Sequence, residues 1–348
     1  MGVGEAASVG ASLKDRHFLS MLDFSREEIL AVLETARRMK GNVAKPSVPP
    51  SIPGPGTGES RPVPAATPPT RRGVAESPLA GRTLAMIFQK PSLRTRVSFE
   101  TGMTMLGGHA IYLSPSDISL GQRETSEDIA LVLSRYVDLI MARVFGHEIV
   151  VELAKHATVP VINGLSDYEH PCQIMADFLT VLERKGRLDG VEGCYIGDGN
   201  NVCHSLLLGA ARVGMHFTAI TPRGYEPNPD VVNAATKEGA KSGSKITVCN
   251  DLKAATGADM VYTDVWASMG QESEAAARKK VFKDYRIDAN TMKIAKRDCI
   301  ILHCLPAHYG DEIDYATSRA PNSAIFDQAE NRMHAQNALM VHLLGVAP

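Results

Sequence analysis

The chain has 348 residues, of which 44% are hydrophobic and 22% are charged, and its formal net charge is -2. This length exceeds what one hydrophobic core usually serves, so we expect two domains in an ordinary globular protein. The balanced charge, without a long basic run, argues against a nucleic-acid partner, and no stretch has the roughly 18 apolar residues that a membrane span needs.

The first predicted element is a helix over residues 25–40, and a proline-rich segment follows it. Residues 46–69 hold nine of the chain's 20 prolines and almost no large apolar side chain. This composition is typical of extended or disordered chain, so we expect residues 46–78 to be a flexible insertion in the first domain. Its removal should be tolerated.

From residue 82 onward, short strand-like runs alternate with segments of helical spacing. The runs lie at residues 83–88, 109–113, 138–144, 159–163, 193–198, 216–221, 245–250, 259–265 and 299–305. Strict alternation predicts an α/β fold with two doubly wound parallel-sheet domains joined by interdomain helices. The first domain would comprise residues 12–165 with 329–346, and the second would comprise residues 166–328. A helix beginning near Pro171 would join them, and a last helix over residues 331–345 would pack back on the first domain.

Unusual polar residues follow the predicted strands. Parallel sheets bind ligands beyond the carboxyl ends of their strands. The residues at those ends are Ser92, Arg143, Asn163, Asn201, Asp264, His303 and Cys304. The sequence therefore predicts one ligand site at this edge.

The run "PSLRTR", residues 91–96, begins a predicted helix directly after a buried strand. Ser92 and Thr95 offer hydroxyl groups beside the free backbone N–H groups of a helix start, and Arg94 offers a planar fork for phosphate or carboxylate. The alternative is a capped helix with surface arginines. Because the Gly-x-x-x-x-Gly-Lys of a nucleotide loop is lacking, the predicted anion is a small phosphate compound.

The run "HPCQ" places His170 and Gln173 around a helix start at Pro171, where proline is well tolerated. The two side chains could donate to one carbonyl oxygen. Alternatively, His170 caps the helix and Gln173 lies on its surface.

The run "GDGNN" matches only the beginning of a dinucleotide fingerprint, because Val202 stands where the third glycine belongs. This argues against a nicotinamide-dependent dehydrogenase. Asn201 remains available as an amide contact.

The run "DVWASMG" suits a zwitterion, because Asp264 could take an ammonium group while the amides of Ser268 and Met269 take a carboxylate. The alternative is a structural loop around a buried Trp266. In "HCLPAH", Cys304 is either a functional thiol or an inert buried side chain. Arg332 could equally form a plain ion pair with Glu330.

The six cysteines lack paired spacing in a chain of this size, so we expect reduced thiols. The Cys-x-x-Cys and His-Glu-x-x-His patterns are lacking too, so neither a metal site nor a cofactor is predicted.

Taken together, the motifs resemble those of the transcarbamylase family. They are "FQKPSLRTRVSFETG", "MARVFGHE", "HPCQIMAD", "GDGNNVCHS", "DVWASMGQ", "HCLPA" and "FDQAENRMHAQNA", and they occur in that order over most of residues 17–345. This set of motifs is most similar to that of the ornithine carbamoyltransferase branch, and the residues within the motifs are most similar to those of plant-type members. Aspartate carbamoyltransferases share the Ser-x-Arg-Thr-Arg signal but lack the Ser-Met-Gly loop and the cysteine before Leu-Pro.

The resemblance implies a carbamoyl phosphate-binding first domain and an ornithine-binding second domain. Carbamoyl phosphate would be bound by Ser92, Leu93, Arg94, Thr95, Arg143, His170, Gln173, Cys304, Leu305 and Arg332. Ornithine would be bound by Asn201, Asp264, Ser268 and Met269. The implied catalytic residues are Cys304, Arg94, Arg143 and His170, with Cys304 as the proton acceptor of the family and the departing phosphate as a further proton sink.

The resemblance also implies a homotrimer with shared active sites and no cofactor. Residues 116–124 match the loop that reaches a neighbouring subunit, with Ser119 and Arg123 as the expected contributors. Two features depart from the family pattern: Leu93 stands where many members have threonine or methionine, and the proline-rich insertion has no counterpart that we can assign.

Two other functions remain open at this point. The chain could carbamoylate a related acceptor such as an acylated ornithine, or it could be a catalytically silent homologue that serves as a binding subunit. Plant-type relatives work in the plastid, and the first residues lack the long Ser- and Arg-rich leader of a precursor, which suits a mature form in the chloroplast stroma. The cytosol and the mitochondrial matrix are the alternatives.

Overall fold

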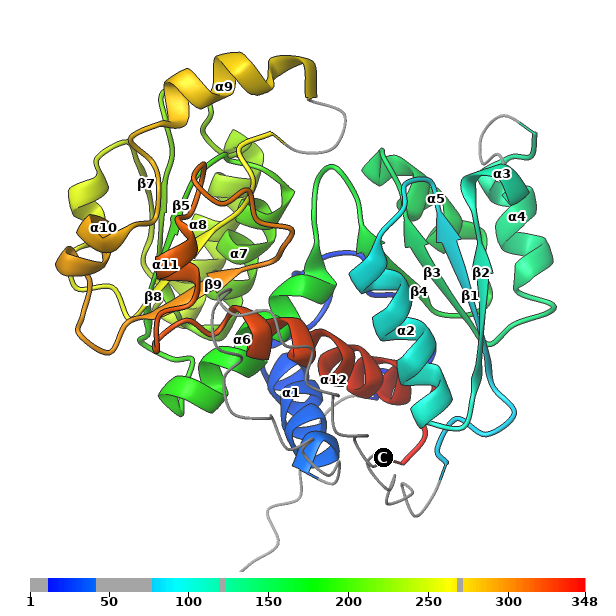
Figure 1. Cartoon of the computed structure of the whole chain (residues 1–348). Coiled ribbons are helices and arrows are strands. Elements are labelled where there is room, and N and C mark those ends of the chain that lie inside the picture. Colours follow the sequence, from blue (N-terminus) through cyan, green and yellow to red (C-terminus); the bar gives the residue numbers. More distant parts are fainter. Residues whose placement is uncertain (1–11, 42–76, 119–122, 268–271, 348) are drawn as a thin grey trace, which may run out of the picture.

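The computed structural model describes residues 12–41, 77–118, 123–267 and 272–347, and these form two β-sheets surrounded by helices (Figure 1). Within these residues the first sheet has strand order β2-β1-β3-β4 and the second has order β7-β6-β5-β8-β9. Neighbouring strands in both sheets are parallel. The predicted α/β class with two doubly wound parallel sheets is confirmed.

The central strands of the first sheet, β1 and β3, are buried on both faces, as expected for parallel strands, whereas the edge strand β2 is partly exposed. Leu84 and Met86 of β1 share a core with Phe99 of α2, whereas Ala85 and Ile87 share a second core with helices α4 and α5. The elements of this sheet are β1 Thr83–Phe88, α2 Leu93–Met105, β2 His109–Leu113, α3 Pro115–Ile118, α4 Ser126–Leu133, β3 Leu139–Arg143, α5 His147–His156 and β4 Val161–Leu165.

The second sheet is built in the same way. Tyr195 and Tyr262 face the core that contains α6 and α7, whereas Cys194 and Val261 face a separate core on the other side. Its elements are β5 Glu192–Ile196, α7 Asn201–Val213, β6 His216–Ile220, α8 Pro229–Ser242, β7 Ile246–Cys249, β8 Met260–Thr263, α9 Ala275–Phe282, α10 Ala289–Ile294, β9 Ile300–His303 and α11 Tyr315–Ser318, with short 3-10 turns at Leu252–Ala255 and Glu272–Glu274.

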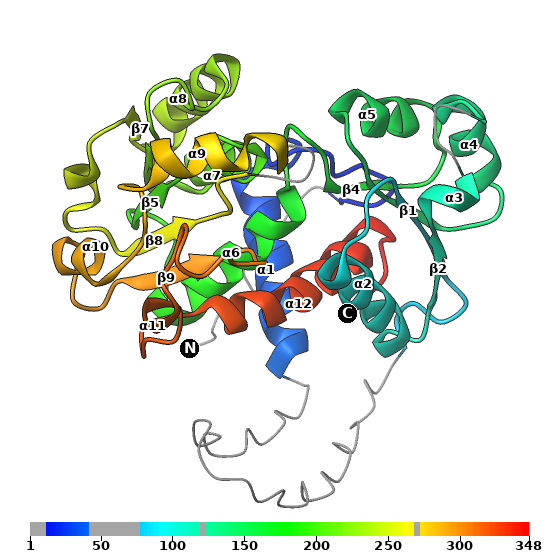
Figure 2. The same ribbon diagram turned by 45° about the horizontal axis from the view of Figure 1, so that its top comes forward.

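Three helices lie between the two sheets: α1 Arg26–Gly41, α6 Pro171–Lys185 and α12 Ile325–Leu343 (Figures 1 and 2). Helix α12 contacts α6, α1 and α2, so the last helix packs back on the first unit as predicted. One continuous hydrophobic core contains residues of both sheets and of these three helices. The two units are therefore held in one frame by apolar packing, which is the main driving force of folding.

The sequence located the strands well and the peripheral helices poorly. All nine predicted strands occur in the described residues, with ends displaced by no more than two residues. The last helix begins at Ile325, earlier than predicted, and helices α8, α9, α10 and α11 were not anticipated. The proline-rich insertion at residues 46–69 lies outside the described residues, so its expected flexibility stays a prediction.

Two positions in the topology are suited to ligand binding. In the first sheet the chain order reverses at β1 and β3, and in the second it reverses at β5 and β8. Ligands of open α/β sheets bind beyond the carboxyl ends of strands at such switch points. The ends of β1 and β3 lead to Ser92 and Arg143, and those of β5 and β8 lead to Asn201 and Asp264.

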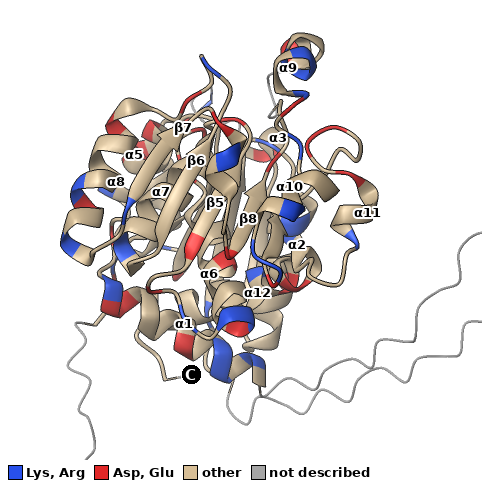
Figure 3. Ribbon diagram, turned by 90° about the vertical axis from the view of Figure 1, so that its left-hand side faces the viewer, with Lys and Arg blue, Asp and Glu red and all other residues tan. Residues whose placement is uncertain are grey.

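The distribution of charge matches the expectation from composition. Figure 3 shows basic and acidic residues interspersed over the helices, without a continuous basic stripe in that view. Among the residues that the structure describes, none of the helices combines the length and the apolar character needed to cross a bilayer.

Candidate active site

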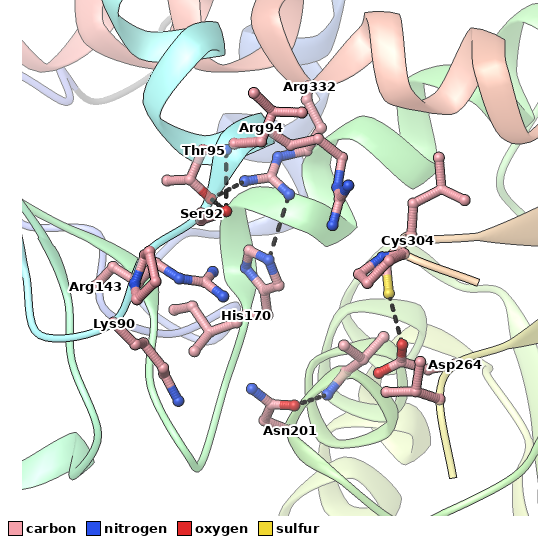
Figure 4. Close-up of a pocket in the computed structure, with 17 residues that line it drawn as sticks. Lys90, Ser92, Arg94, Thr95, Arg143, His170, Asn201, Asp264, Cys304 and Arg332 are labelled. Carbon is pink, nitrogen blue, oxygen red and sulfur yellow. Dashed lines mark hydrogen bonds between the residues drawn. The ribbon is translucent and has the colours of Figure 1, made fainter. Parts of the chain in front are cut away.

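The switch points of the two sheets open into one pocket with a cavity of about 270 Å³. Its lining includes most of the residues predicted from the sequence: Ser92, Leu93, Arg94, Thr95, Arg143, His170, Asn201, Asp264, Cys304, Leu305 and Arg332. In Figure 4 the arginines and His170 surround one end of this space, and Cys304 and Asp264 lie opposite them. The structure therefore brings together residues from seven separate motifs.

The anion-binding end begins at the N-terminus of α2. Ser92 is the N-cap of this helix, and its hydroxyl accepts a hydrogen bond from the backbone N–H of Thr95 at 3.3 Å. The Ser92 hydroxyl also donates to the Thr95 hydroxyl at 3.1 Å. The capping role that the sequence left as an alternative is thus real, and it coexists with a place in the pocket. The helix start adds partial positive charge to this end.

Three arginines concentrate positive charge around the same space. Arg143 and Arg332 are 8% and 3% exposed, and Arg94 is partly buried. Burial, followed by the charges of Arg332 and Arg94, lowers the pKa of Arg143 to about 10, so its guanidinium is still charged at neutral pH. Burial also lowers the pKa values of Arg94 and Arg332. Like charges held this close favour a multiply charged anion, because the anion compensates both their repulsion and their desolvation.

His170 lies among these cations and is neutral. Burial, followed by the charges of Arg332 and Arg143, lowers its pKa well below the usual value. Arg332 Nη1 lies 3.3 Å from His170 Nε2, and because a guanidinium only donates, this nitrogen is the acceptor. His170 is also the N-cap of α6, but its side chain makes no capping hydrogen bond.

Gln173 stands apart from the other predicted ligands. It is buried, is not part of the pocket lining, and uses its amide on neighbouring side chains. Its oxygen accepts from Arg332 Nη1 at 2.5 Å, and its nitrogen donates to Asp177 Oδ1 at 2.8 Å. In this structure Gln173 supports Arg332, and its expected contact with carbamoyl phosphate beside His170 stays a prediction.

The opposite end of the pocket is acidic and sulfur-containing. The Cys304 thiol donates to Asp264 Oδ1 at 3.0 Å, and Asn200 Nδ2 donates to Asp264 Oδ2 at 2.8 Å. Burial, followed by the charge of Asp264, raises the pKa of Cys304 well above its usual value. The sequence left two possibilities for this residue, a thiolate and a hydrogen-bonding thiol, and the geometry favours the thiol.

The other predicted contacts vary in their surroundings. Asn201 lines the pocket while its amide nitrogen donates to the Ser166 carbonyl at 2.6 Å. Leu93 is 75% exposed, which fits a contact through its backbone. Leu305 has a positive φ of 59°, which turns the chain sharply after Cys304.

Several predictions concern residues at the edge of, or beyond, the described part of the chain. Ser268 and Met269, expected at the ornithine end, lie outside the described residues, and so does Ser119 of the expected intersubunit loop. Arg123 from that loop is described, and its guanidinium lies 4.0 Å from Glu124. Arg96 has no place in the pocket lining, because it pairs with Glu100 at 2.9 Å and lies over the ring of Tyr112.

The acidic end contains three side chains of the types that bind metals. Ligand atoms of Asp264, His303 and Cys304 lie within 4.8 Å of one another. However, His303 Nδ1 accepts from the Leu305 N–H at 2.9 Å, and Nε2 lies 3.2 Å from Glu312 Oε1. Since both ring nitrogens have partners within the protein, this histidine acts as a brace for the loop.

Lys90 is a pocket residue that the sequence reasoning missed. It is 8% exposed and lines the anion-binding end, with its ammonium over the ring of Phe145. Burial, followed by the charge of Arg143, lowers its pKa to about 8. The signal was present in the sequence, because Lys90 stands two residues after β1, at the same edge as Ser92.

The lowered pKa of Lys90 predicts a pH-dependent affinity for anions. Its charge is complete well below pH 8 and is lost as the pH rises through that value. We expect the Kd of inorganic phosphate, measured by calorimetry, to rise several-fold between about pH 7.5 and about pH 9.5. Lys90→Gln should bind phosphate more weakly at the lower pH and show a flatter profile. A variant profile parallel to that of the parent protein would contradict this assignment.

The fold and the pocket define the class of protein. Two doubly wound domains meet at their switch points, one bringing a cationic anion site and the other an aspartate with a thiol. This is the arrangement of a two-substrate α/β enzyme, in which one domain holds an anionic substrate and the other holds a substrate with a basic group.

Comparison with known proteins identifies the family. A model described as "Aspartate/ornithine carbamoyltransferase, carbamoyl-P binding domain" matches residues 16–183, and the "Asp/Orn binding domain" model of the same family matches residues 189–343. The chain belongs to the aspartate/ornithine carbamoyltransferase family.

Individual relatives are similar over nearly the whole chain. A protein of Pisum sativum named "Ornithine carbamoyltransferase, chloroplastic" is 50% identical over 97% of this chain and 82% of its own length. The ornithine carbamoyltransferase of Pyrococcus horikoshii is 47% identical over 96% of this chain and 97% of its own. The solved structure of ornithine carbamoyltransferase from Pyrococcus furiosus is 46% identical, has a TM-score of 0.85, and covers 97% of this chain and 99% of its own. Archaeal relatives are thus about as similar as the plant one.

Proposed function

We propose that this chain is an ornithine carbamoyltransferase, which transfers the carbamoyl group of carbamoyl phosphate to the side-chain amine of L-ornithine and yields L-citrulline and phosphate. The observation that carries the proposal is the pocket itself, in which Arg94, Arg143 and Arg332 face the pair of Asp264 and Cys304. The first group suits a phosphate, and the second suits the amine of an amino acid. The names of the relatives agree with this acceptor.

The proposed reaction needs little covalent chemistry from the protein. The neutral side-chain amine of ornithine attacks the carbonyl carbon, a C–N bond forms, and the bond from that carbon to the phosphate oxygen breaks. Negative charge develops on the carbonyl oxygen and on the leaving phosphate. Arg143, His170 and Thr95 are assigned to the carbonyl oxygen, and Ser92 and Arg94 to the phosphate. Catalysis then rests on alignment and on fixed positive charge, for which one donor is worth about 3 kcal/mol of barrier.

The protonation of Cys304 bears on where the amine's proton goes. Its thiol donates to Asp264 and its pKa is raised, so a resting thiolate is disfavoured. We assign to Cys304 a hydrogen-bonding role that orients Asp264 toward the substrate amine. The departing phosphate is then the final proton acceptor. Cys304 and the departing phosphate, which the family resemblance implies as proton acceptors, thus have separate roles in this proposal.

The catalytic unit is proposed to be a homotrimer in which residues 116–124 complete the site of a neighbouring subunit. The support is the sequence match of this loop to the family and the exposed apolar side chains Leu131, Val132 and Tyr136 of the same domain. Residues 12–165 with 329–346 are proposed as the carbamoyl phosphate-binding domain, and residues 166–328 as the ornithine-binding domain.

The biological setting is proposed from the reaction and from the relatives. Production of citrulline from ornithine is a step of arginine biosynthesis, and one archaeal relative is named an anabolic ornithine carbamoyltransferase. The chloroplast stroma is supported by the name of the plant relative, whereas the archaeal and bacterial relatives support a cytosolic alternative. The mitochondrial matrix is the third possibility.

The acceptor assay tests this function directly. The purified protein, supplied with carbamoyl phosphate, is expected to form citrulline and phosphate in equal amounts from ornithine. N-acetylornithine and aspartate, at equal concentration, should give rates at least about 100-fold lower, because neither offers Asp264 the same pair of amines. Activity confined to N-acetylornithine or aspartate would replace the proposed acceptor. Saturable binding of phosphate without turnover of any acceptor would favour a silent binding subunit.

A further inference from the structure

A buried carboxylate outside the pocket connects the two ends of the site. Asp177 lies in the middle of α6 and has no exposed surface. Its Oδ1 accepts two hydrogen bonds, from Gln173 Nε2 at 2.8 Å and from Gln328 Nε2 at 2.7 Å. Gln173 belongs to α6 and Gln328 to α12, so the carboxylate bridges the two long interdomain helices.

The first arm of this network ends at the anion-binding site. Gln173 donates to Asp177, and its oxygen accepts from Arg332 Nη1 at 2.5 Å. Arg332 lines the pocket, and its Nη2 also donates to the Thr95 hydroxyl at 3.4 Å. A shift of Asp177 would therefore reach a guanidinium that faces the phosphate.

The second arm ends on the strands that carry the acceptor side of the pocket. The oxygen of Gln328 accepts from the backbone N–H of His303 at 2.8 Å, directly before Cys304. The amide nitrogen of Gln328 also lies 3.1 Å from the Tyr262 hydroxyl, two residues before Asp264. Both residues that face the substrate amine are thus close in sequence to a contact of Gln328.

The chemistry of the three groups fixes the direction of every bond. A side-chain amide has one donor end and one acceptor end. Burial raises the pKa of Asp177 to about 7, but Oδ1 accepts from both amides in either protonation state, because the proton of the neutral form would lie on Oδ2. Because both amides turn their nitrogen atoms to Asp177, both must turn their oxygen atoms outward, one to Arg332 and the other to the His303 N–H. An apolar side chain at position 177 would leave both amides free to rotate and would leave buried donors without partners, which is costly.

We propose that Asp177 is a positioning residue that holds Arg332 and the strand of Cys304 in one fixed geometry, and thereby couples carbamoyl phosphate binding to the acceptor side of the site. This rests on the proposed function for its catalytic readout. The coupling runs through direct contacts only, from Arg332 through Gln173, Asp177 and Gln328 to His303.

Two substitutions at position 177 separate hydrogen bonding from mere packing. Asp177→Asn keeps one oxygen that can accept from both amides, whereas Asp177→Leu keeps a similar shape and accepts nothing. We expect Asp177→Leu to lower kcat/KM for carbamoyl phosphate and for ornithine by about tenfold or more each, and Asp177→Asn to recover most of this loss. A purely structural role predicts a lower Tm with unchanged kinetic constants in the folded protein. That result, or equal losses in both variants, would overturn the proposal.

A second variant covers the case in which Asp177→Leu does not fold. Gln328→Ala removes a side chain whose hydrogen bonds join His303 and Tyr262 of the acceptor-side strands and Asp177, yet we expect it to raise the Kd of inorganic phosphate by several-fold. Its matched control is Asn331→Ala, which removes another buried amide of α12. The side-chain hydrogen bonds of Asn331 join Thr180 and Glu183 of α6 and Lys40 of α1, and none of these three residues lines the pocket. The control is expected to lose stability without a change in phosphate affinity.

The outcomes distinguish the inference from the proposed function. Calorimetry with inorganic phosphate needs no turnover, so it reports on the coupling even if the parent protein makes no citrulline. Equal phosphate affinity in Gln328→Ala and the parent protein would overturn the coupling. An equal loss of phosphate affinity in Asn331→Ala would also overturn the coupling, because the loss would then come from disturbed helix packing in general.

Discussion

Arg94→Ala is expected to lower kcat/KM for carbamoyl phosphate by about 10²–10³-fold and to leave the fold intact. Arg94 follows the N-cap Ser92 and lines the anion-binding end of the pocket. Loss of one fixed donor to developing charge in a water-poor site costs about 3 kcal/mol of barrier, which corresponds to this range. The measurement is steady-state kinetics of citrulline formation, with thermal unfolding of both proteins recorded in the same buffer.

The next arginine on the same helix, Arg96, provides the matched control. Arg96 pairs with Glu100 at 2.9 Å and lies over Tyr112, outside the pocket lining. Arg96→Ala removes the same charge two residues away, and we expect kcat/KM within about threefold of the parent value with a stability loss of about 1 kcal/mol or less. Equal kinetic losses at both positions would mean that general positive charge, and not the placement of Arg94, serves the reaction.

The anion-binding end was predictable because its residues follow the strands directly. Ser92, Arg94 and Arg143 stand within a few residues of a strand end, and the switch-point rule then brings them together. The rule applies to Lys90 in the same way. It was missed because a lysine between a strand and a helix has the usual appearance of a solvated loop residue, and only its exposed fraction of 8% reveals its place in the pocket.

The direction of the Gln173 side chain could not be predicted from the spacing of polar and apolar residues. In α6 every residue from Pro171 to Val181 is buried, so the helix has no polar face that would mark a side directed to solvent. Spacing from His170 therefore could not decide whether Gln173 faces the ligand or the interior. The network with Asp177 and Gln328 depends on residues far apart in the chain, and only the packing of α6 against α12 brings them together.

Helix α8, which was not anticipated, shows a different limit of the sequence pattern. In α8 the buried residues are Val231, Ala235 and Gly239, which have the correct four-residue spacing but are small. A pattern of large apolar residues therefore fails to detect this helix, although it packs closely against α7. The strands carry dense β-branched and aromatic residues, and for that reason they were found within two residues of their ends.

Asp264→Asn is expected to lower kcat/KM for ornithine by about 100-fold or more while the Kd of inorganic phosphate changes by less than about threefold. The asparagine keeps the shape of the side chain but removes the charge that accepts from Cys304 and Asn200 and is proposed to face the amine. Loss of one partner of a buried, hydrogen-bonded charge pair costs roughly 2–5 kcal/mol, and this cost falls on the amine-binding end. The measurement is citrulline formation at saturating carbamoyl phosphate, with ornithine varied, beside calorimetry with phosphate.

A double variant divides the two tasks of Asp264. If the carboxylate acted only by holding the Cys304 thiol, then Asp264→Asn would cost nothing further in a Cys304→Ala background. We expect a further rise of about tenfold in KM for ornithine in that background, because the carboxylate is proposed also to bind an ammonium group of the substrate. Full additivity of the two substitutions would mean that thiol and carboxylate act independently, despite the 3.0 Å hydrogen bond between them. Partial additivity would agree with the hydrogen bond in the structure and would mean that the Cys304 thiol orients the Asp264 carboxylate toward the substrate.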